Sequence, residues 1–193
     1  MKFDFGNGLV DAHQHVNPDG SIGGWVADTA KVEKTVLVTE NARVSENARV
    51  FENARVFGNA RVSENARVFR NARVSENAQV FGDALVSENA QVSGNARVSE
   101  IAWIFENAWI SENARVSENA QVFGNARVFG DVRVFGNAWI FGDAQVFGDA
   151  RVSEDALVSE NAQVFGDARV FGDARVFGNA SGNTQVFGEN HEI

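Results

Sequence analysis

Apolar residues recur along the chain with a period of six. From Val26 to Val176 every sixth residue is Val, except for Ile104, Ile110 and Ile140. Ala almost always stands two positions before each of these residues, and Arg or Gln usually stands between the two. Apolar residues at alternate positions are typical of a short β-strand with one buried face. The pattern therefore predicts a series of short strands whose Val and Ala side chains share the buried face.

Two polar or small residues follow each predicted strand and indicate a corner. The first is mostly Gly or Glu, and the second is Asn or Asp from Asn41 onward, with Ile101 as the exception. Gly, Asn and Asp tolerate the left-handed backbone conformation that tight corners need. Each hexapeptide is thus predicted to form a four-residue strand and a two-residue corner. Stacked copies bury Val and Ala in one core, whereas these apolar spacings do not fit the 3.6-residue period of a helix.

The phrase Val-x-x-Asn-Ala-x, repeated in one phase from Val26 to Ala180, resembles the hexapeptide repeat of left-handed parallel β-helix proteins. The resemblance implies an all-β, single-domain, triangular solenoid of between eight and nine coils, with three hexapeptides in each coil. Its left-handedness is implied by the resemblance alone. The phrase GGWVADTAKV, followed by NARV repeats, is also similar to uncharacterised proteins of bacteria and their phages, which imply no activity.

The repeat divides the chain into three predicted parts. Residues 1–24 are predicted to form an N-terminal cap, residues 25–180 the hexapeptide β-helix, and residues 181–193 a C-terminal cap or tail. In the last part GN recurs after four residues instead of six, so Val186 leaves the earlier register. Solenoids need caps because their open strand edges otherwise pair with other chains.

One face of the predicted solenoid gathers unusual residues. The stretch IAWIFENAWISEN carries Trp103 and Trp109 in positions that elsewhere hold Arg or Gln. If three hexapeptides make a coil, Trp103 and Trp139 share a face and flank Gln121. We call this predicted apolar surface the tryptophan plaque; it comprises Leu85, Trp103, Phe105, Gln121, Phe123, Trp139, Phe141 and Leu157. Its aromatic residues and symmetric order favour contact with a second copy; a dimer is favoured and a trimer is the alternative. A different protein or ligand, and simple surface stacking, are the alternatives.

A second face carries a row of arginines, which we call the arginine ladder. Its members are Arg43, Arg61, Arg97, Arg115, Arg133, Arg151 and Arg169. A row of cations suggests a polyanion site. However, Glu46, Glu64, Glu100, Glu118 and Glu154 each follow a ladder arginine by three residues. We therefore expect mutual neutralisation on a solvated face.

Charge and composition restrict the chemistry. The formal net charge of −9 disfavours nucleic acid as a partner. The chain has no Cys, and no His lies between Val26 and Ala180, so the coils lack thiolate ligands and a histidine base for acyl transfer. His13 and His15 are a weak candidate for a zinc site, because an extended strand places both rings on one side. We expect no catalytic residues and no cofactor.

The sequence predicts a non-enzymatic, rigid scaffold or binding protein that self-associates, possibly one carried by a phage. The alternative is an acidic protein that sequesters a host protein as a nucleic-acid mimic, and a hexapeptide acyltransferase is the third candidate. The chain shows no apolar run long enough for a signal peptide or a membrane span, so a cytoplasmic protein without membrane contact is expected.

Overall fold

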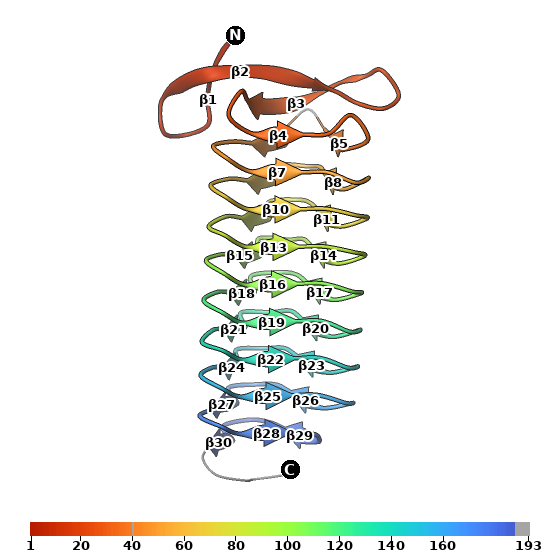
Figure 1. The fold of residues 1–193 in the computed structure, drawn as a ribbon. Coiled ribbons are helices and arrows are strands. Elements are labelled where there is room, and N and C mark those ends of the chain that lie inside the picture. The colour runs from red at the N-terminus through yellow and green to blue at the C-terminus, as the bar shows by residue number, and fades with distance from the viewer. Residues whose placement is uncertain (40, 188–193) are drawn as a thin grey trace.

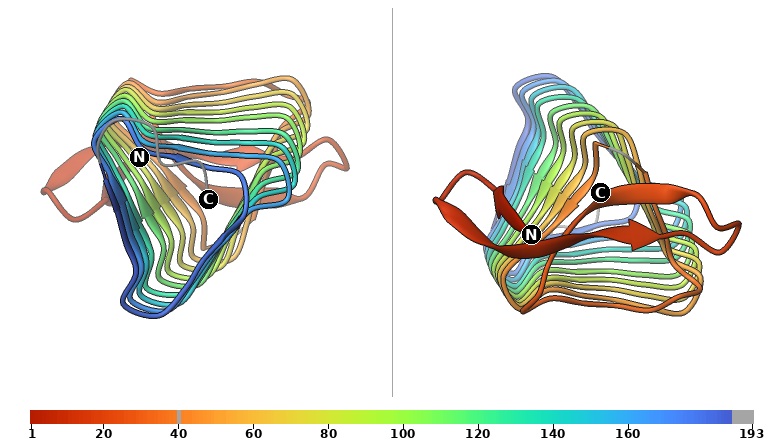
Figure 2. Two further views of the ribbon diagram at one scale, coloured as in Figure 1. Left: turned by 90° about the horizontal axis from the view of Figure 1, so that it is seen from below. Right: turned by 90° about the horizontal axis from the view of Figure 1, so that it is seen from above.

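The protein, in a computed structural model that describes residues 1–39 and 41–187, is an all-β solenoid of triangular section (Figures 1 and 2). The chain runs from left to right along the near face of Figure 1 and returns behind while it descends, so the coil is left-handed. From β3 onward, consecutive strands lie on three different sheets, and each strand pairs in parallel with the strand one coil later. The predicted fold class is confirmed.

Three sheets form the sides of the triangle. The arginine sheet has twelve strands: β1 (Lys2–Asp4), β2 (Leu9–Val16), β3 (Ile22–Ala27), β6 (Arg43–Val44), β9 (Arg61–Val62), β12 (Gln79–Val80), β15 (Arg97–Val98), β18 (Arg115–Val116), β21 (Arg133–Val134), β24 (Arg151–Val152), β27 (Arg169–Phe171) and β30 (Gln185–Phe187). The plaque sheet has nine: β4 (Lys31–Val32), β7 (Arg49–Val50), β10 (Arg67–Val68), β13 (Leu85–Val86), β16 (Trp103–Ile104), β19 (Gln121–Val122), β22 (Trp139–Ile140), β25 (Leu157–Val158) and β28 (Arg175–Val176). The third sheet also has nine: β5 (Leu37–Val38), β8 (Arg55–Val56), β11 (Arg73–Val74), β14 (Gln91–Val92), β17 (Trp109–Ile110), β20 (Arg127–Val128), β23 (Gln145–Val146), β26 (Gln163–Val164) and β29 (Asn179–Ala180).

The core is a column of Val, Ile and Ala side chains along the solenoid axis. These side chains are fully buried in nearly every coil, and Ile104, Ile110 and Ile140 are the largest of them. Burial of this apolar surface is the main favourable contribution to folding. The predicted alternation between a buried and an outward face is therefore confirmed.

The corners differ from the prediction in two respects. Each strand is two residues long in most coils, because the residues on either side already bend toward the corner. The left-handed φ falls on the first corner residue, as at Glu46 (φ 57°) and Gly136 (φ 73°). Among the second corner residues that the structure describes, only Asn53 has a positive φ. A backbone hydrogen bond of 3.2 Å from Ala48 to Ser45 closes a representative turn.

Antiparallel strands cover the N-terminal end of the solenoid (Figure 2). Strand β2 pairs antiparallel with both β1 and β3, and β3 joins the coils by pairing in parallel with β6. The ring of Phe3 stacks on Trp25 at 4.4 Å. At the other end β30 pairs with β27 after a coil that is two residues shorter, which brings Val186 opposite Val170. The predicted tail at 181–193 lies partly outside the described residues.

Candidate binding surfaces

The tryptophan plaque lies on five adjacent strands of the plaque sheet, from β13 to β25. Its central residues follow one another in register: Trp103 pairs with Gln121, and Gln121 pairs with Trp139. Leu85 and Leu157 occupy the next strand on either side. The structure therefore brings together the residues that the sequence placed on one face.

Aromatic rings in the plaque form a continuous stack. The ring centroids of Phe105 and Phe123 lie 4.8 Å apart, and those of Phe123 and Phe141 lie 5.0 Å apart with nearly parallel planes. Trp139 meets Phe123 edge to face at 6.3 Å. The indoles of Trp103 and Trp139 are each 44% exposed, whereas the Phe rings are half-buried. The plaque is thus a ridge of stacked rings with two tryptophans open to a partner.

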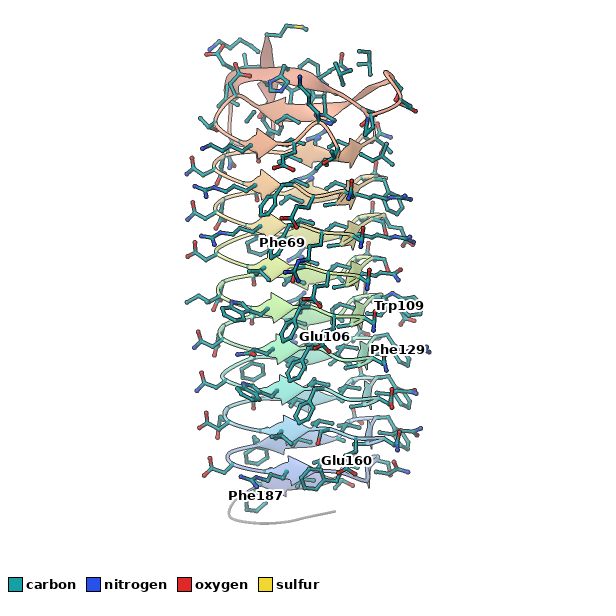
Figure 3. The ribbon with its side chains drawn as sticks, turned by 45° about the vertical axis from the view of Figure 1, so that its right-hand side comes forward. Phe69, Glu106, Trp109, Phe129, Glu160 and Phe187 are labelled. Atoms are coloured by element: carbon teal, nitrogen blue, oxygen red, sulfur yellow. The ribbon has the colours of Figure 1, made fainter. Side chains whose placement is uncertain are left out.

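The third tryptophan of the coils lies on a different side of the triangle. Trp109 projects from the third sheet, near Phe129 (Figure 3). Its indole Nε1 donates to the Ser93 hydroxyl over 3.3 Å, and the Arg127 guanidinium lies 5.8 Å from the ring centroid. Because its exposed fraction of 43% matches those of the plaque tryptophans, Trp109 is a natural comparison residue for the plaque.

A groove of about 600 Å³ runs along the arginine ladder, and we call it the arginine groove. Its lining consists of Asn77, Gln79, Asn95, Arg97, Asn113, Arg115, Asp131, Arg133, Asp149 and Arg151. A second hollow of about 460 Å³ is lined by Phe3, Trp25, Asn41, Arg43, Asn59, Arg61 and Asn77. Asn77 therefore lines both hollows. Together they follow the arginine sheet from the cap to β24.

In the described residues the arginine ladder makes no direct ion pair with the glutamates that follow it. Ion pairs in 1–39 and 41–187 join Lys2 to Asp11, His13 to Asp28, and Arg70 to both Glu52 and Glu88; none includes a ladder arginine. The Glu residues occupy the corner that follows each ladder strand. Four ladder arginines line a groove with the Asn and Asp residues of the preceding corner, whereas Arg43 and Arg61 also line a hollow with Glu46 and Glu64.

Side-chain amides at the corners form ladders parallel to the solenoid axis. In each step an Asn Nδ2 donates to the Oδ1 of the Asn or Asp one coil later, over distances of 2.8 to 3.5 Å. One ladder runs Asn59, Asn77, Asn95, Asn113 and Asp131; others run Asn71, Asn89, Asn107, Asn125 and Asp143, Asn47 and Asn65, and Asn119, Asn137 and Asp155. The recurrence of Asn in one column of the repeat was the sequence signal for these ladders.

The two N-terminal histidines do not share a site. The register of the β2–β3 pairing shifts between Gln14 and Val16, on either side of His15. His13 is exposed and its Nδ1 lies 2.8 Å from Asp28, whereas His15 is buried and its Nε2 lies 2.9 Å from the Val36 carbonyl oxygen. Burial lowers the pKa of His15. In the described part of the chain no cluster of three or more His, Cys, Asp or Glu residues suits a metal, so the candidate zinc pair is not formed.

The repeats themselves identify a known type of solenoid. The family model described as the YdcK beta solenoid repeat matches residues 54–70, 60–76, 90–104, 120–134, 144–160 and 162–178. These coils are similar to YdcK-type beta solenoid repeats. The matched segments contain strands of all three sheets and include Trp103, whereas Trp139 lies between two matched segments. No curated protein matches the sequence.

Solved structures of acyltransferases have a similar fold. LpxA, a UDP-N-acetylglucosamine acyltransferase from Bacteroides fragilis, is 16% identical with a TM-score of 0.54, and the match covers 83% of this chain and 68% of that one. An Arabidopsis UDP-N-acetylglucosamine acyltransferase is 12% identical with a TM-score of 0.47, and the match covers 84% and 69%. At these identities the similarity is one of fold. No helix in the described residues has the length and apolar character to cross a membrane.

Proposed function

We propose that this protein is a non-enzymatic, rigid scaffold that self-associates through the tryptophan plaque. The observation that supports the proposal is the exposure of Trp103 and Trp139, 44% each, on one side of a stacked ridge of Phe rings. Exposed aromatic surface of this kind is costly in water and is concentrated at protein interfaces. Contact with a second copy removes both indoles from water.

The order of residues in the plaque specifies how two copies meet. Gln121 is central, with a Trp on each neighbouring strand and a Leu one strand further out. A two-fold axis through Gln121 and along the strand direction makes the two solenoids antiparallel. Trp103 then faces Trp139 of the second copy, and the two Gln121 amides face one another. An isologous contact of this kind uses the same patch on both subunits and closes as a dimer.

The regular backbone makes the solenoid suitable as a scaffold. Each coil is joined to the next by backbone hydrogen bonds on all three sides, such as Arg49 to Ala66 and Arg55 to Ala72, both 2.9 Å. The corner ladders add side-chain bonds in the same direction. Because every connection is between neighbouring coils, the plaque is held on a stiff, extended support.

The absence of an enzymatic role is part of the proposal. The similar acyltransferase structures share the fold, but acyl transfer needs a base that activates the nucleophile. The sequence between Val26 and Ala180 contains many Ser residues and no His. His13 and His15 belong to the cap, where each already has its own hydrogen-bond partner.

The solution mass of the protein tests the proposal. Light scattering after size exclusion should give a dimer of the 20.9 kDa chain. The double variant Trp103→Arg/Trp139→Arg should be a monomer with an unchanged circular dichroism spectrum, because two cations cannot be buried in an apolar contact. Trp109→Arg is the matched control, since it makes the same change at equal exposure on the third sheet and should remain dimeric. A monomeric wild-type protein, or a dimeric double variant, would contradict the proposal.

A further inference from the structure

We infer that the arginine groove binds an acidic polysaccharide, a linear polymer of uronic acids, extended along the solenoid axis. The groove lies on the arginine sheet, so it is separate from the plaque and does not depend on self-association. Four arginines line it on adjacent strands: Arg97 pairs with Arg115, Arg115 with Arg133, and Arg133 with Arg151. The result is a row of cations at the strand spacing of about 4.8 Å.

These guanidinium groups are available to an anion. None of the ion pairs in the described residues includes Arg97, Arg115, Arg133 or Arg151. A guanidinium binds a carboxylate through two parallel N–H donors, which gives a stronger and more directional contact than a Lys ammonium. The row therefore offers one bidentate carboxylate site per coil. A uronic acid polymer carries one carboxylate per ring, so its charges recur along an extended chain.

The opposite wall of the groove favours a ligand with hydroxyl groups. It consists of the Asn77, Asn95 and Asn113 amides, followed by the Asp131 and Asp149 carboxylates. Ionised carboxylates only accept hydrogen bonds; Asp131 Oδ1 accepts one from the Asn113 amide over 2.9 Å, and the other carboxylate oxygens of Asp131 and Asp149 can accept from donors on a ligand. Sugar hydroxyls supply such donors, whereas a polyphosphate brings only negative oxygens next to Asp131 and Asp149. A polymer with both carboxylates and hydroxyls therefore fits both walls.

The composition of the groove also argues against single-stranded nucleic acid. Proteins that bind single strands stack the bases on aromatic side chains. The arginine groove contains no aromatic residue, and aromatic rings enter only in the adjoining hollow, where Phe3 stacks on Trp25. That stacked pair lies next to Arg43 and Arg61, and the Arg43 guanidinium lies over the Phe3 ring, 5.2 Å from its centroid. The shared residue Asn77 makes the two hollows one continuous path.

The net charge of −9 opposes any polyanion, so the local row of cations must outweigh the field of the whole molecule. The contacts are solvent-exposed ion pairs, and added salt screens them. Binding is therefore expected to weaken as the salt concentration rises. A neutral oligosaccharide of the same length lacks the charge-assisted contacts and should not bind measurably.

Calorimetric titration with a hexameric oligogalacturonate at low salt tests the inference. The wild-type protein should bind it, and Arg115→Gln/Arg133→Gln should bind on the order of tenfold more weakly or worse, because two charge-assisted contacts are lost. Arg49→Gln/Arg67→Gln is the matched control: it removes two arginines from the same repeat position on the plaque sheet and should leave the affinity unchanged.

Parallel titrations with maltohexaose, an inorganic polyphosphate and a single-stranded oligonucleotide define the class of ligand. Tighter binding of the polyphosphate or the oligonucleotide than of the oligogalacturonate would overturn the assignment to acidic polysaccharide. No binding of oligogalacturonate, or equal binding by both double variants, would overturn the groove as its site. These outcomes do not depend on the solution mass, which tests the plaque alone.

Discussion

Gly136 is the position where the stacking of coils can be tested most directly. It is a first corner residue with φ 73°, and a Cβ placed on it would lie 2.5 Å from the Glu154 nitrogen and 2.8 Å from the Glu154 Cα. Both atoms belong to the backbone of the next coil, so no side-chain rotation can relieve the contact. That coil is also held in place, because the Asn137 N–H donates to the Glu154 carbonyl oxygen over 2.7 Å. Gly136→Ala must therefore push two hydrogen-bonded coils apart.

The expected loss of stability for Gly136→Ala has two contributions. A left-handed conformation costs a residue with a Cβ roughly 1–2 kcal/mol, and overpacking adds roughly 1–3 kcal/mol. We therefore expect about 2–5 kcal/mol in the free energy of unfolding. Gly182→Ala should show the first contribution alone, because Gly182 has φ 61° and no atom within 4 Å of its would-be Cβ. Glu100→Ala, at the equivalent corner two coils earlier (φ 58°), keeps a Cβ and should change stability least.

Guanidinium-induced unfolding of the three variants measures these differences, and hydrogen exchange shows where they arise. Coils of a solenoid interact only with their neighbours, so a local change can loosen a few coils before the whole chain unfolds. The amides of Asn137 and its neighbours should exchange faster in Gly136→Ala and not in Glu100→Ala. Equal losses of stability for Gly136→Ala and Gly182→Ala, with unchanged exchange at Asn137, would refute the close approach of coils as the cause.

Two further predictions concern the cap and the core. Burial holds the pKa of His15 below its usual 6.5 in the folded protein. The unfolded chain therefore binds the proton more readily than the folded one. The contribution of His15 to the free energy of unfolding is constant above about pH 6.5 and falls as the pH drops from there toward the pKa of the folded state. Unfolding midpoints at pH 7 and pH 5 should differ more for the wild type than for His15→Gln, and equal pH dependence would contradict this account. Ile104→Ala should cost about 2–5 kcal/mol and Ile104→Val about 0.5–1.5 kcal/mol, because Ile104 is fully buried; equal losses in denaturant unfolding would contradict the packing described.

The fold was predictable because two sequence periods, of two residues within each strand and of eighteen residues between coils, determine its main contacts. Alternation within the hexapeptide determines which side chains are buried, and grouping by three hexapeptides determines which residues become neighbours. Trp103 and Trp139 could therefore be assigned to one face, on either side of Gln121, before any coordinates were known. The same reasoning correctly separated Trp109 from them.

Contacts that depend on the direction of a side chain could not be predicted from these periods. Arg115 and Glu118 are close in sequence, yet the arginine lines the groove beside the preceding corner and does not pair with the glutamate. At the cap, His15 is buried and His13 is exposed, beside a bulge in the β2–β3 pairing. A bulge depends on how two strands pair, so the spacing His-x-His alone carries no trace of it.

Closure of the triangle after three hexapeptides also restricts how such a gene can change in length. Arg67 pairs with Leu85, eighteen residues later, and the same offset repeats along the plaque sheet. Duplication or loss of eighteen codons adds or removes a whole coil and returns every downstream residue to its original side. A gain or loss of six codons keeps the buried Val and Ala in phase but moves every downstream residue to the next side of the triangle. Such a change within the tryptophan plaque or the arginine groove would divide that surface between two sides of the triangle, although the protein would still fold. The fold is therefore preserved by length changes in steps of six residues, whereas a binding surface is preserved only by steps of eighteen.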